Sequence, residues 1–255
     1  MYSERYDDIM FSVTGMQGFE LFSTVHIVTL ALFFAACCAL VYYRKKRRIY
    51  QHIIKWTLFI LLPACEISLH VWLILTNQWG LSDLPLQLCS LSTFLSLFLF
   101  LKKNNKVFFL LYFFGTLTPI LAMVTPDMAY TFPHFRYIEY FLHHSVIPLA
   151  AFYFILYEGY RVPKKAILFS FLTINIIAVP VFFLNLLLGT NFFYLAEPTE
   201  AKTILTFFGS GIMYYINLEI AALIVFFITY IPMGVFQRIE NKTKKIEVKK
   251  DNGFS

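Results

Sequence analysis

The sequence predicts an all-α membrane protein, a bundle of seven transmembrane helices. Of its 255 residues, 59% are hydrophobic and only 14% are charged, whereas soluble domains are about half apolar and about a quarter charged. The apolar residues gather into seven runs, each long enough to cross roughly 30 Å of hydrocarbon as a helix. None of these runs alternates as the strands of a membrane barrel do, and a helix satisfies its own backbone hydrogen bonds in lipid.

The seven helices define one membrane domain, residues 1–236, which a basic tail, residues 237–255, follows. The longest connection, residues 189–209, contains Phe192, Phe193 and Tyr194, which are typical of an interfacial or re-entrant segment folded over the mouth of the bundle. We expect the helices over residues 18–42, 53–76, 84–101, 107–124, 136–158, 166–188 and 210–233.

The basic residues predict the orientation of the chain. With Lys55, the clusters at 44–48, 102–106, 161–165 and in the tail hold 18 of the 21 Lys and Arg residues, all on one side of the predicted bundle. The positive-inside rule then puts the N-terminus outside and the C-terminus in the cytoplasm of a protein of the cell membrane. Because this bias explains the net charge of +6, we expect no nucleic-acid binding.

Ionisable side chains inside the predicted helices mark the candidate site, because burying one in a bilayer costs about 2.5–3.5 kcal/mol. At about 1.5 Å per residue, Cys89 lies roughly 8 Å and Glu66 roughly 15 Å below the outer ends of their helices. The inner half offers little beyond Asn175 and hydroxyl groups. We therefore predict one polar layer in the outer half of the bilayer, drawn from five helices: His26, Glu66, His70, Cys89, Glu139, His143, His144 and Glu219.

Glu66 and His70 are spaced i,i+4 and share a helix face. A polar pair of this kind either clamps two helices together or serves a ligand or a proton relay, and both interpretations remain open. The chain has no HxxxH or HExxH spacing, so we expect neither a metal ion nor another cofactor.

Cys89 is a single thiol in the first turns of the third predicted helix. A Cys in an apolar helix usually packs as a small hydrophobe, but the helix dipole favours a thiolate there and a neighbouring His would activate it as a nucleophile. The fifth helix carries His143 and His144, which point about 100° apart. Periodicity favours His143, because it shares a face with Arg136, Glu139 and Tyr140.

Several short motifs, in order over nearly the whole chain, give it a family resemblance. They are FSTVH (22–26), Glu66, LPLQLC (84–89), TPD (125–127), FLHHSVIPLAAFY (141–153), and GTNFFYL (189–195) followed by Pro198. With these motifs the chain resembles the YwaF-like bacterial integral membrane proteins and their eukaryotic relatives, the transmembrane protein 164 family of acyltransferases. It departs from the family pattern at Gln87, where His is frequent, and over residues 210–215.

The resemblance implies a phospholipid acyltransferase or lipid hydrolase whose partners are membrane phospholipids. Its nucleophile would be Cys89, and the F-x-x-H pattern makes His144 the base, in contrast to the His143 that periodicity favours. A small-molecule or ion transporter that uses the same polar layer is one alternative, and a non-catalytic sensor or scaffold is another. We take as candidate substrate-binding residues His26, Glu66, His70, Gln87, Asn191, Tyr194 and Tyr214. Of these, Asn191 and Tyr194 are the candidate donors to an oxyanion.

Overall fold

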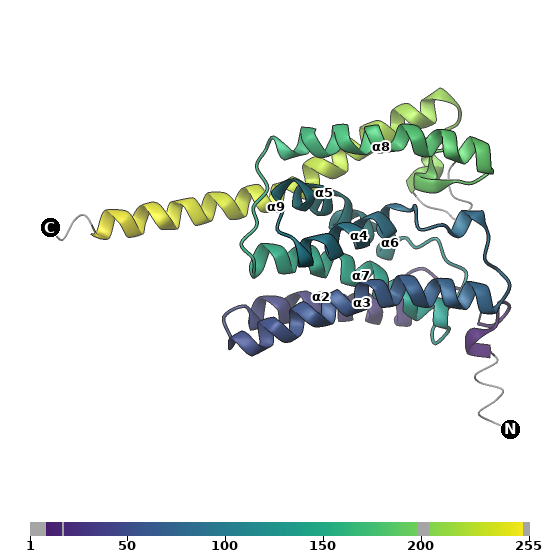
Figure 1. Cartoon of the computed structure of the whole chain (residues 1–255), viewed down its shortest axis with the longest axis horizontal. Helices are drawn as coiled ribbons and strands as arrows, with labels where there is room; N and C mark the ends of the chain where they lie inside the picture. The colour runs from purple at the N-terminus through teal and green to yellow at the C-terminus, as the bar shows by residue number, and fades with distance from the viewer. Residues whose placement is uncertain (1–8, 17, 198–203, 252–255) are drawn as a thin grey trace, which may run out of the picture.

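The computed structural model is all-helical and describes residues 9–16, 18–197 and 204–251, with no strand among them (Figure 1). Arg5, Pro198 and Lys202 lie outside the described residues. The predicted seven spans are confirmed, since seven helical segments are long and apolar enough to cross a membrane. These spans are Thr24–Tyr43, Arg48–Leu75, Leu81–Leu101, Asn105–Val124, Phe135–Leu156, Ala166–Leu188 and Ile212–Thr243.

The spans are built from eight α-helices and one short 3-10 turn. The first begins at residue 24 and not at the expected 18, because Ser23 caps it by accepting a hydrogen bond from the backbone N–H of His26. The helices are α2 (Thr24–Tyr43), α3 (Arg48–Leu75), α4 (Leu88–Leu101, after the turn Leu81–Asp83), α5 (Asn105–Gly115), α6 (Leu117–Val124), α7 (Phe135–Leu156), α8 (Ala166–Leu188) and α9 (Ile212–Asp251).

The fourth span differs from the single helix expected over 107–124, because it breaks into α5 and α6 at Thr116. Pro119 explains the break, since its ring has no N–H and would clash with the carbonyl of Gly115, four residues earlier. Gly115 also allows a close helix approach. A Cβ atom there would lie 3.0 Å from Ile147 Cγ2 on α7 and 3.4 Å from Ser92 Cβ on α4.

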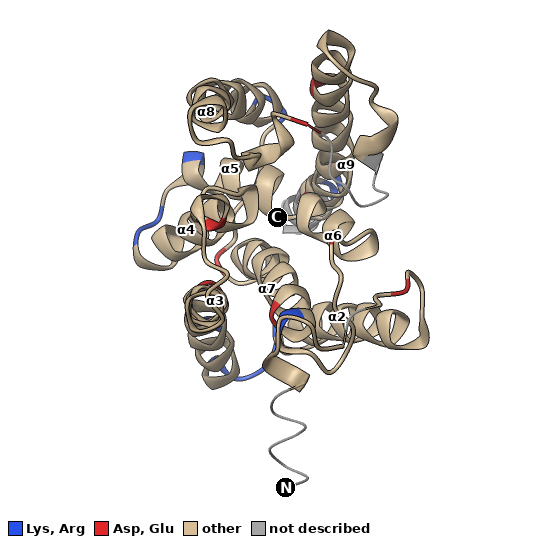
Figure 2. Cartoon of the chain, turned by 90° about the vertical axis from the view of Figure 1, so that its right-hand side faces the viewer, with Lys and Arg blue, Asp and Glu red and all other residues tan. Residues whose placement is uncertain are grey.

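Helix α7 is the central element of the bundle. It packs against α2, α3, α4, α5 and α6, and Figure 2 shows it among these helices. In the most apolar 18-residue stretch of α7, 61% of the residues are buried inside the protein, against 17% in the corresponding stretches of α2 and α8. Polar side chains on α7 are therefore shielded by protein from the surrounding lipid.

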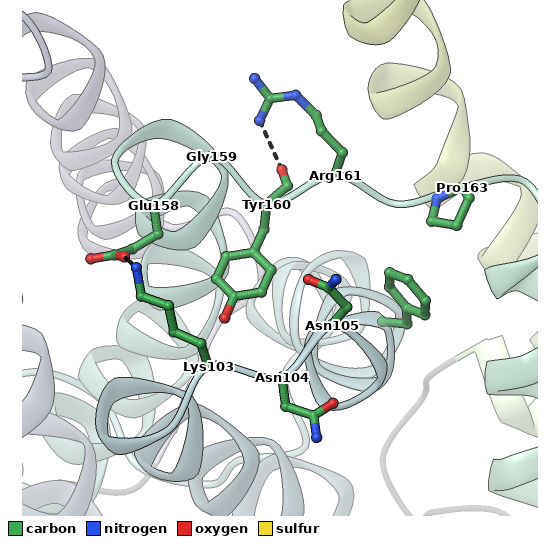
Figure 3. A pocket seen from close by; sticks show the side chains of 9 residues that line it. Lys103, Asn104, Asn105, Glu158, Gly159, Tyr160, Arg161 and Pro163 are labelled. Atoms are coloured by element: carbon green, nitrogen blue, oxygen red, sulfur yellow. Dashed lines mark hydrogen bonds and ion pairs between the residues drawn. The ribbon is translucent and has the colours of Figure 1, made fainter.

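The two ends of the bundle differ in charge. One end carries the Lys and Arg clusters that follow α2, α4 and α7, and a cavity opens there (Figure 3). Helix α9 projects beyond this end (Figure 1) and continues without a break through residue 237, where we expected the tail to begin. The other end carries the amino-terminal ends of α4 and α7, where the candidate site lies.

Candidate functional site

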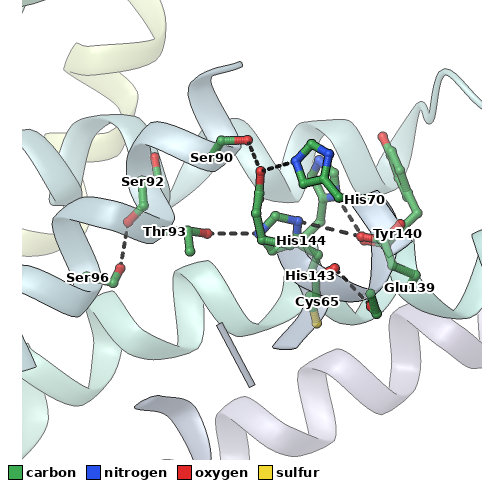
Figure 4. A network of polar contacts seen from close by, with 12 residues as sticks. Cys65, His70, Ser90, Ser92, Thr93, Ser96, Glu139, Tyr140, His143 and His144 are labelled. Atoms are coloured by element: carbon green, nitrogen blue, oxygen red, sulfur yellow. Dashed lines mark hydrogen bonds and ion pairs between the residues drawn. The ribbon is translucent and has the colours of Figure 1, made fainter. Parts of the chain in front are cut away.

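A buried polar network joins α3, α4 and α7 (Figure 4). Ser90 Oγ donates a hydrogen bond to Glu66 Oε1 at 2.7 Å. Thr93 Oγ1 and His143 Nε2 lie 2.8 Å apart, and the same imidazole nitrogen is 3.5 Å from Glu66 Oε2. All four side chains are buried, so the network holds a carboxylate and an imidazole together inside an otherwise apolar bundle.

Three further ionisable side chains, His70, Glu139 and Arg136, extend this network. His70 Nε2 lies 3.7 Å from Glu66 Oε1, the contact that the i,i+4 spacing predicts. On the other side, His143 Nδ1 is 3.8 Å from Glu139 Oε1, and Arg136 donates to Glu139 Oε2. Within the described part of the chain, Glu66 Oε2 and His70 Nε2 are buried without a hydrogen-bond partner. These two atoms retain hydrogen-bonding capacity inside the protein.

His144 lies outside this network. Its Nδ1 is 2.8 Å from the carbonyl oxygen of Tyr140, and the two rings stack with centroids 4.0 Å apart. Because a carbonyl oxygen only accepts, Nδ1 carries the proton and Nε2 keeps its lone pair. When His144 is neutral, this contact holds it in the tautomer of a general base, whereas both nitrogens of His143 face other polar groups.

Cys89 lies in the first turn of α4, half-buried, with its thiol within electrostatic range of Glu66 and Glu139. Lys103 follows α4, Glu158 follows α7, and their side chains pair at 2.8 Å. The carboxyl-terminal ends of the two helices are therefore neighbours, and the helices run in the same direction. Cys89 lies one turn of α4 before Thr93, the residue that contacts His143. Within the part of the chain that the structure describes, Cys89 forms no hydrogen bond with either imidazole.

The connection after α8 is anchored by Asn185, which is only 2% exposed. Its Nδ2 donates to the carbonyl of Phe192 at 2.9 Å, and its Oδ1 accepts from the Phe192 N–H and from Thr190 Oγ1, each at 2.9 Å. One amide side chain therefore fixes the path of residues 189–192 as they leave the helix.

The same connection reaches the start of α4. Gln87 Oε1 accepts a hydrogen bond from the Phe193 N–H at 3.2 Å, and the Tyr214 hydroxyl donates to the Tyr194 carbonyl at 2.6 Å. Phe193 and Tyr194 both have positive φ, 59° and 55°, which non-glycine residues rarely adopt. Three segments distant in sequence thus meet beside Cys89, at the cost of local backbone strain.

Tyr194 contributes a phenolic hydroxyl group to this connection. Burial, together with the nearby Asp127, Cys89 and Tyr214, raises the pKa of Tyr194 to about 12. Its hydroxyl stays protonated near neutral pH and is able to donate a hydrogen bond. The Asn191 side chain is used within the connection, because Nδ2 donates to the Glu197 carbonyl at 2.8 Å.

His26 does not join the other candidate residues. It is fully buried, accepts from the Phe22 N–H at 3.0 Å through Nδ1, and bonds through Nε2 to the Met123 carbonyl at 2.8 Å. It therefore connects α2 to α6. Glu219 is also separate, since its carboxylate accepts from Asn175 Nδ2 at 3.2 Å between α8 and α9. The expected single layer is thus not one cluster, because His26 and Glu219 each lie apart from the network around Glu66 and His143.

Sequence reasoning did not single out Ser90, Thr93 or Asn185. Ser90, Thr93 and Ser96 repeat every three residues on α4, which is a readable polar stripe, and Asn185 is an amide in the last turn of a lipid-facing helix. Among the described residues, no group of three His, Cys, Asp or Glu side chains is arranged to hold a metal ion.

In a comparison with protein-family models, residues 21–230 match the model described as the TMEM164 family. The matched region includes all seven spans up to the middle of α9. The comparison with curated proteins and the comparison with solved structures each gave no significant match.

Proposed function

Because the chain belongs to the TMEM164 family, we propose that this multi-pass membrane protein moves a fatty acyl chain from a membrane phospholipid through a thioester on Cys89. The acceptor is a second lipid alcohol, or water in a hydrolase. The observation that carries the proposal is the His144 Nδ1 contact with the Tyr140 carbonyl, 2.8 Å long, which leaves Nε2 of the neutral imidazole to act as a base. This geometry favours His144, the residue that the family resemblance implies, over His143.

In the first step, His144 Nε2 takes the proton of the Cys89 thiol, and Sγ forms a bond to the carbonyl carbon of the phospholipid ester. The ester C–O bond then breaks, and the imidazolium gives its proton to the departing oxygen. The products are a lysophospholipid and an acyl thioester on Cys89.

In the second step, the acceptor hydroxyl gives its proton to His144 Nε2 as its oxygen attacks the thioester carbonyl. The C–S bond breaks, and the sulfur takes back the proton. The Tyr194 hydroxyl, protonated because burial raises the pKa of Tyr194 to about 12, is the candidate donor to the oxyanion in both steps. Asn191 is the weaker candidate, because its amide already donates to the Glu197 carbonyl.

We also propose that the Lys- and Arg-rich end of the bundle faces the cytoplasm of a cell-membrane protein, as the positive-inside rule predicts. Cys89, in the first turn of α4, then lies in the outer half of the bilayer. Labelling a Cys introduced at Ser3 with a membrane-impermeant maleimide in whole cells tests this orientation.

The experiment that tests the activity uses purified protein and a phospholipid with a labelled acyl chain. We expect Cys89→Ala and His144→Ala to lose transfer and release of the label, with a loss of about 10²–10⁴-fold for the imidazole. Cys65→Ala is the matched control, because Cys65 is a buried thiol of α3 that also lies within electrostatic range of Glu66 and Glu139. Wild-type rates for both site variants refute the mechanism.

A transporter is the second candidate, and it is favoured by Glu66 Oε2 and His70 Nε2, which are buried and lack a hydrogen-bond partner among the described residues. Such atoms suit transient binding of a proton or a polar substrate. Uptake into proteoliposomes that depends on Glu66 or His70 but survives Cys89→Ala supports this candidate and contradicts acyl transfer.

A further inference from the structure

A second polar site lies at the Lys- and Arg-rich end of the bundle, away from Cys89. A cavity of about 580 Å³ opens there between the turn after α4 and the connection from α7 to α8 (Figure 3). This volume is within the range of small-ligand sites, about 300–1,000 Å³. The side chains of Lys103, Asn105, Glu158 and Tyr160 contribute the polar groups that matter for its chemistry.

Tyr160 is the most informative of these residues. It is only 8% exposed, and its hydroxyl is buried without a hydrogen-bond partner in the described part of the chain. Its ring packs against Phe108, with centroids 4.7 Å apart, and Figure 3 shows the hydroxyl directed between Lys103 and Asn105. Because buried Tyr hydroxyls are normally paired, this one is placed to bind a group that enters the cavity.

Lys103 supplies the positive charge. Its Nζ pairs with Glu158 Oε2 at 2.8 Å, while its side chain is 78% exposed. The Glu158 carboxylate raises the pKa of Lys103, and the nearby Tyr160 contributes, so the ammonium stays charged. An exposed ion pair is weak because water screens it, and an incoming anion is therefore able to take over the Lys103 ammonium from Glu158.

Arg161 fixes one wall of the cavity. Its guanidinium donates to both carboxylate oxygens of Glu240 on α9, at 2.8 and 3.2 Å, and to the backbone carbonyls of Ile155 and Tyr160. These contacts hold the connection after α7 against α9. Arg161 thus positions the connection after α7, and direct binding of a ligand falls to Lys103, Asn105 and Tyr160.

The surroundings of the cavity attract anions. Four exposed lysines belong to the two segments that form it, namely Lys102, Lys106, Lys164 and Lys165. Clustered cations of this kind raise the local concentration of anionic ligands and of anionic lipid head groups.

From these contacts we propose that the cavity binds a phosphate group, with the Lys103 ammonium, the Asn105 amide and the Tyr160 hydroxyl as donors and Glu158 as the competing anion. The phosphate is carried either by a lipid head group at the membrane surface or by a soluble phosphate ester. This site is independent of the acyl chemistry proposed for Cys89.

The test measures binding of dioctanoyl phosphatidic acid and, separately, of glycerol 3-phosphate to the purified full chain in detergent, by isothermal titration calorimetry. We expect Lys103→Gln to weaken binding about tenfold or more and Tyr160→Phe about threefold to tenfold, the effects of a charged and a neutral hydrogen bond. Glu158→Gln removes the competing carboxylate and should strengthen binding. Lys102→Gln, a neighbour that does not line the cavity, should change the Kd less than about twofold.

Binding of phosphatidic acid alone identifies a membrane lipid as the source of the phosphate, and binding of both probes with the same variant pattern identifies a soluble ester. Either result supports the site. The proposal is overturned if neither probe binds, if Lys103→Gln and Tyr160→Phe leave the Kd unchanged, or if Lys102→Gln weakens binding as much as Lys103→Gln. The aromatic packing of residue 160 is kept in Tyr160→Phe, so a folding defect does not explain its result.

Discussion

Replacing Asn185 by alanine removes the side chain that anchors the connection after α8. Three hydrogen bonds of 2.9 Å are lost, two with the backbone of Phe192 and one with the Thr190 hydroxyl. Phe192 is fully buried and Thr190 is 5% exposed, so water does not readily replace the amide. The connection should open while the helices of the bundle stay in place.

The size of the effect follows from these contacts. Each hydrogen bond contributes about 0.5–1.5 kcal/mol, and each buried partner left unpaired costs about 1–3 kcal/mol. Allowing for relaxation, we expect Asn185→Ala to favour opening of residues 189–195 by about 3 kcal/mol, on the order of 100-fold in the opening equilibrium. Because Phe193 and Tyr194 are bonded to Gln87 and Tyr214, acyl transfer should fall as well.

Hydrogen–deuterium exchange of a peptide that covers residues 189–195 measures this opening. Asn175→Ala is the matched control, because Asn175 is an amide of the same helix whose contacts are to Phe171 and Glu219, away from the connection. Wild-type exchange in Asn185→Ala, or equal acceleration in Asn175→Ala, would show that Asn185 does not anchor this segment.

Three other perturbations address the fold. His26→Ala loses the buried hydrogen bond to the Met123 carbonyl and the part-buried one from the Phe22 N–H, and it should destabilise the protein by about 2–4 kcal/mol in thermal unfolding. The exposed His52 should tolerate alanine, and equal unfolding midpoints for the two variants would contradict this role of His26. Burial lowers the pKa of His134 below its usual 6.5, and its Nδ1 must stay unprotonated to accept from the Arg136 N–H. Stability is therefore present above pH 6.5 and lost as the pH falls below it, and His134→Asn should flatten this dependence; an unchanged slope refutes the assignment. Gly115→Ala should destabilise by about 1–3 kcal/mol, because its Cβ would meet Leu111 and Ile147 at 2.8 and 3.0 Å, and an unchanged unfolding midpoint would contradict that close packing.

The spans were predictable because hydropathy reports directly on whether a helix is able to lie in lipid. All seven are found, and the break at Thr116 was readable in principle from Pro119 and the glycine four residues before it. The start of α2 was misplaced by six residues, since the apolar residues before Ser23 belong to a connection that precedes the helix cap. Hydropathy does not distinguish apolar residues of a connection from apolar residues of the helix that follows it.

The candidate site was predictable where helical periodicity fixes neighbours. Glu66 and His70 meet as i,i+4 residues, and His143 and His144 point to different surroundings, with their rings 6.0 Å apart. Ser90 was not predictable. A hydroxyl in a membrane helix often bonds to its own backbone, as Ser96 does with the Ser92 carbonyl, and only the packing of α3 against α4 turns Ser90 toward Glu66.

His26 shows the same limit from the other side. Depth along a helix put it in one layer with Glu66, but rotation about the helix axis and the packing of α2 direct it to the Met123 carbonyl. Depth is set by chain position, whereas the partner of a polar side chain is set by which helices become neighbours. Sequence periodicity alone does not determine that arrangement.

Acyl transfer through Cys89 requires an acyl thioester on its sulfur. Incubating the purified protein with a phospholipid and quenching in acid should add one acyl mass to the peptide that contains Cys89, and hydroxylamine should remove that mass, as it does from thioesters. His144→Ala should prevent the adduct from forming, and Cys65→Ala should leave it unchanged. If Cys89→Ala transfers the acyl chain at the wild-type rate, and the wild-type protein shows no adduct at any time point, acyl transfer through Cys89 is contradicted.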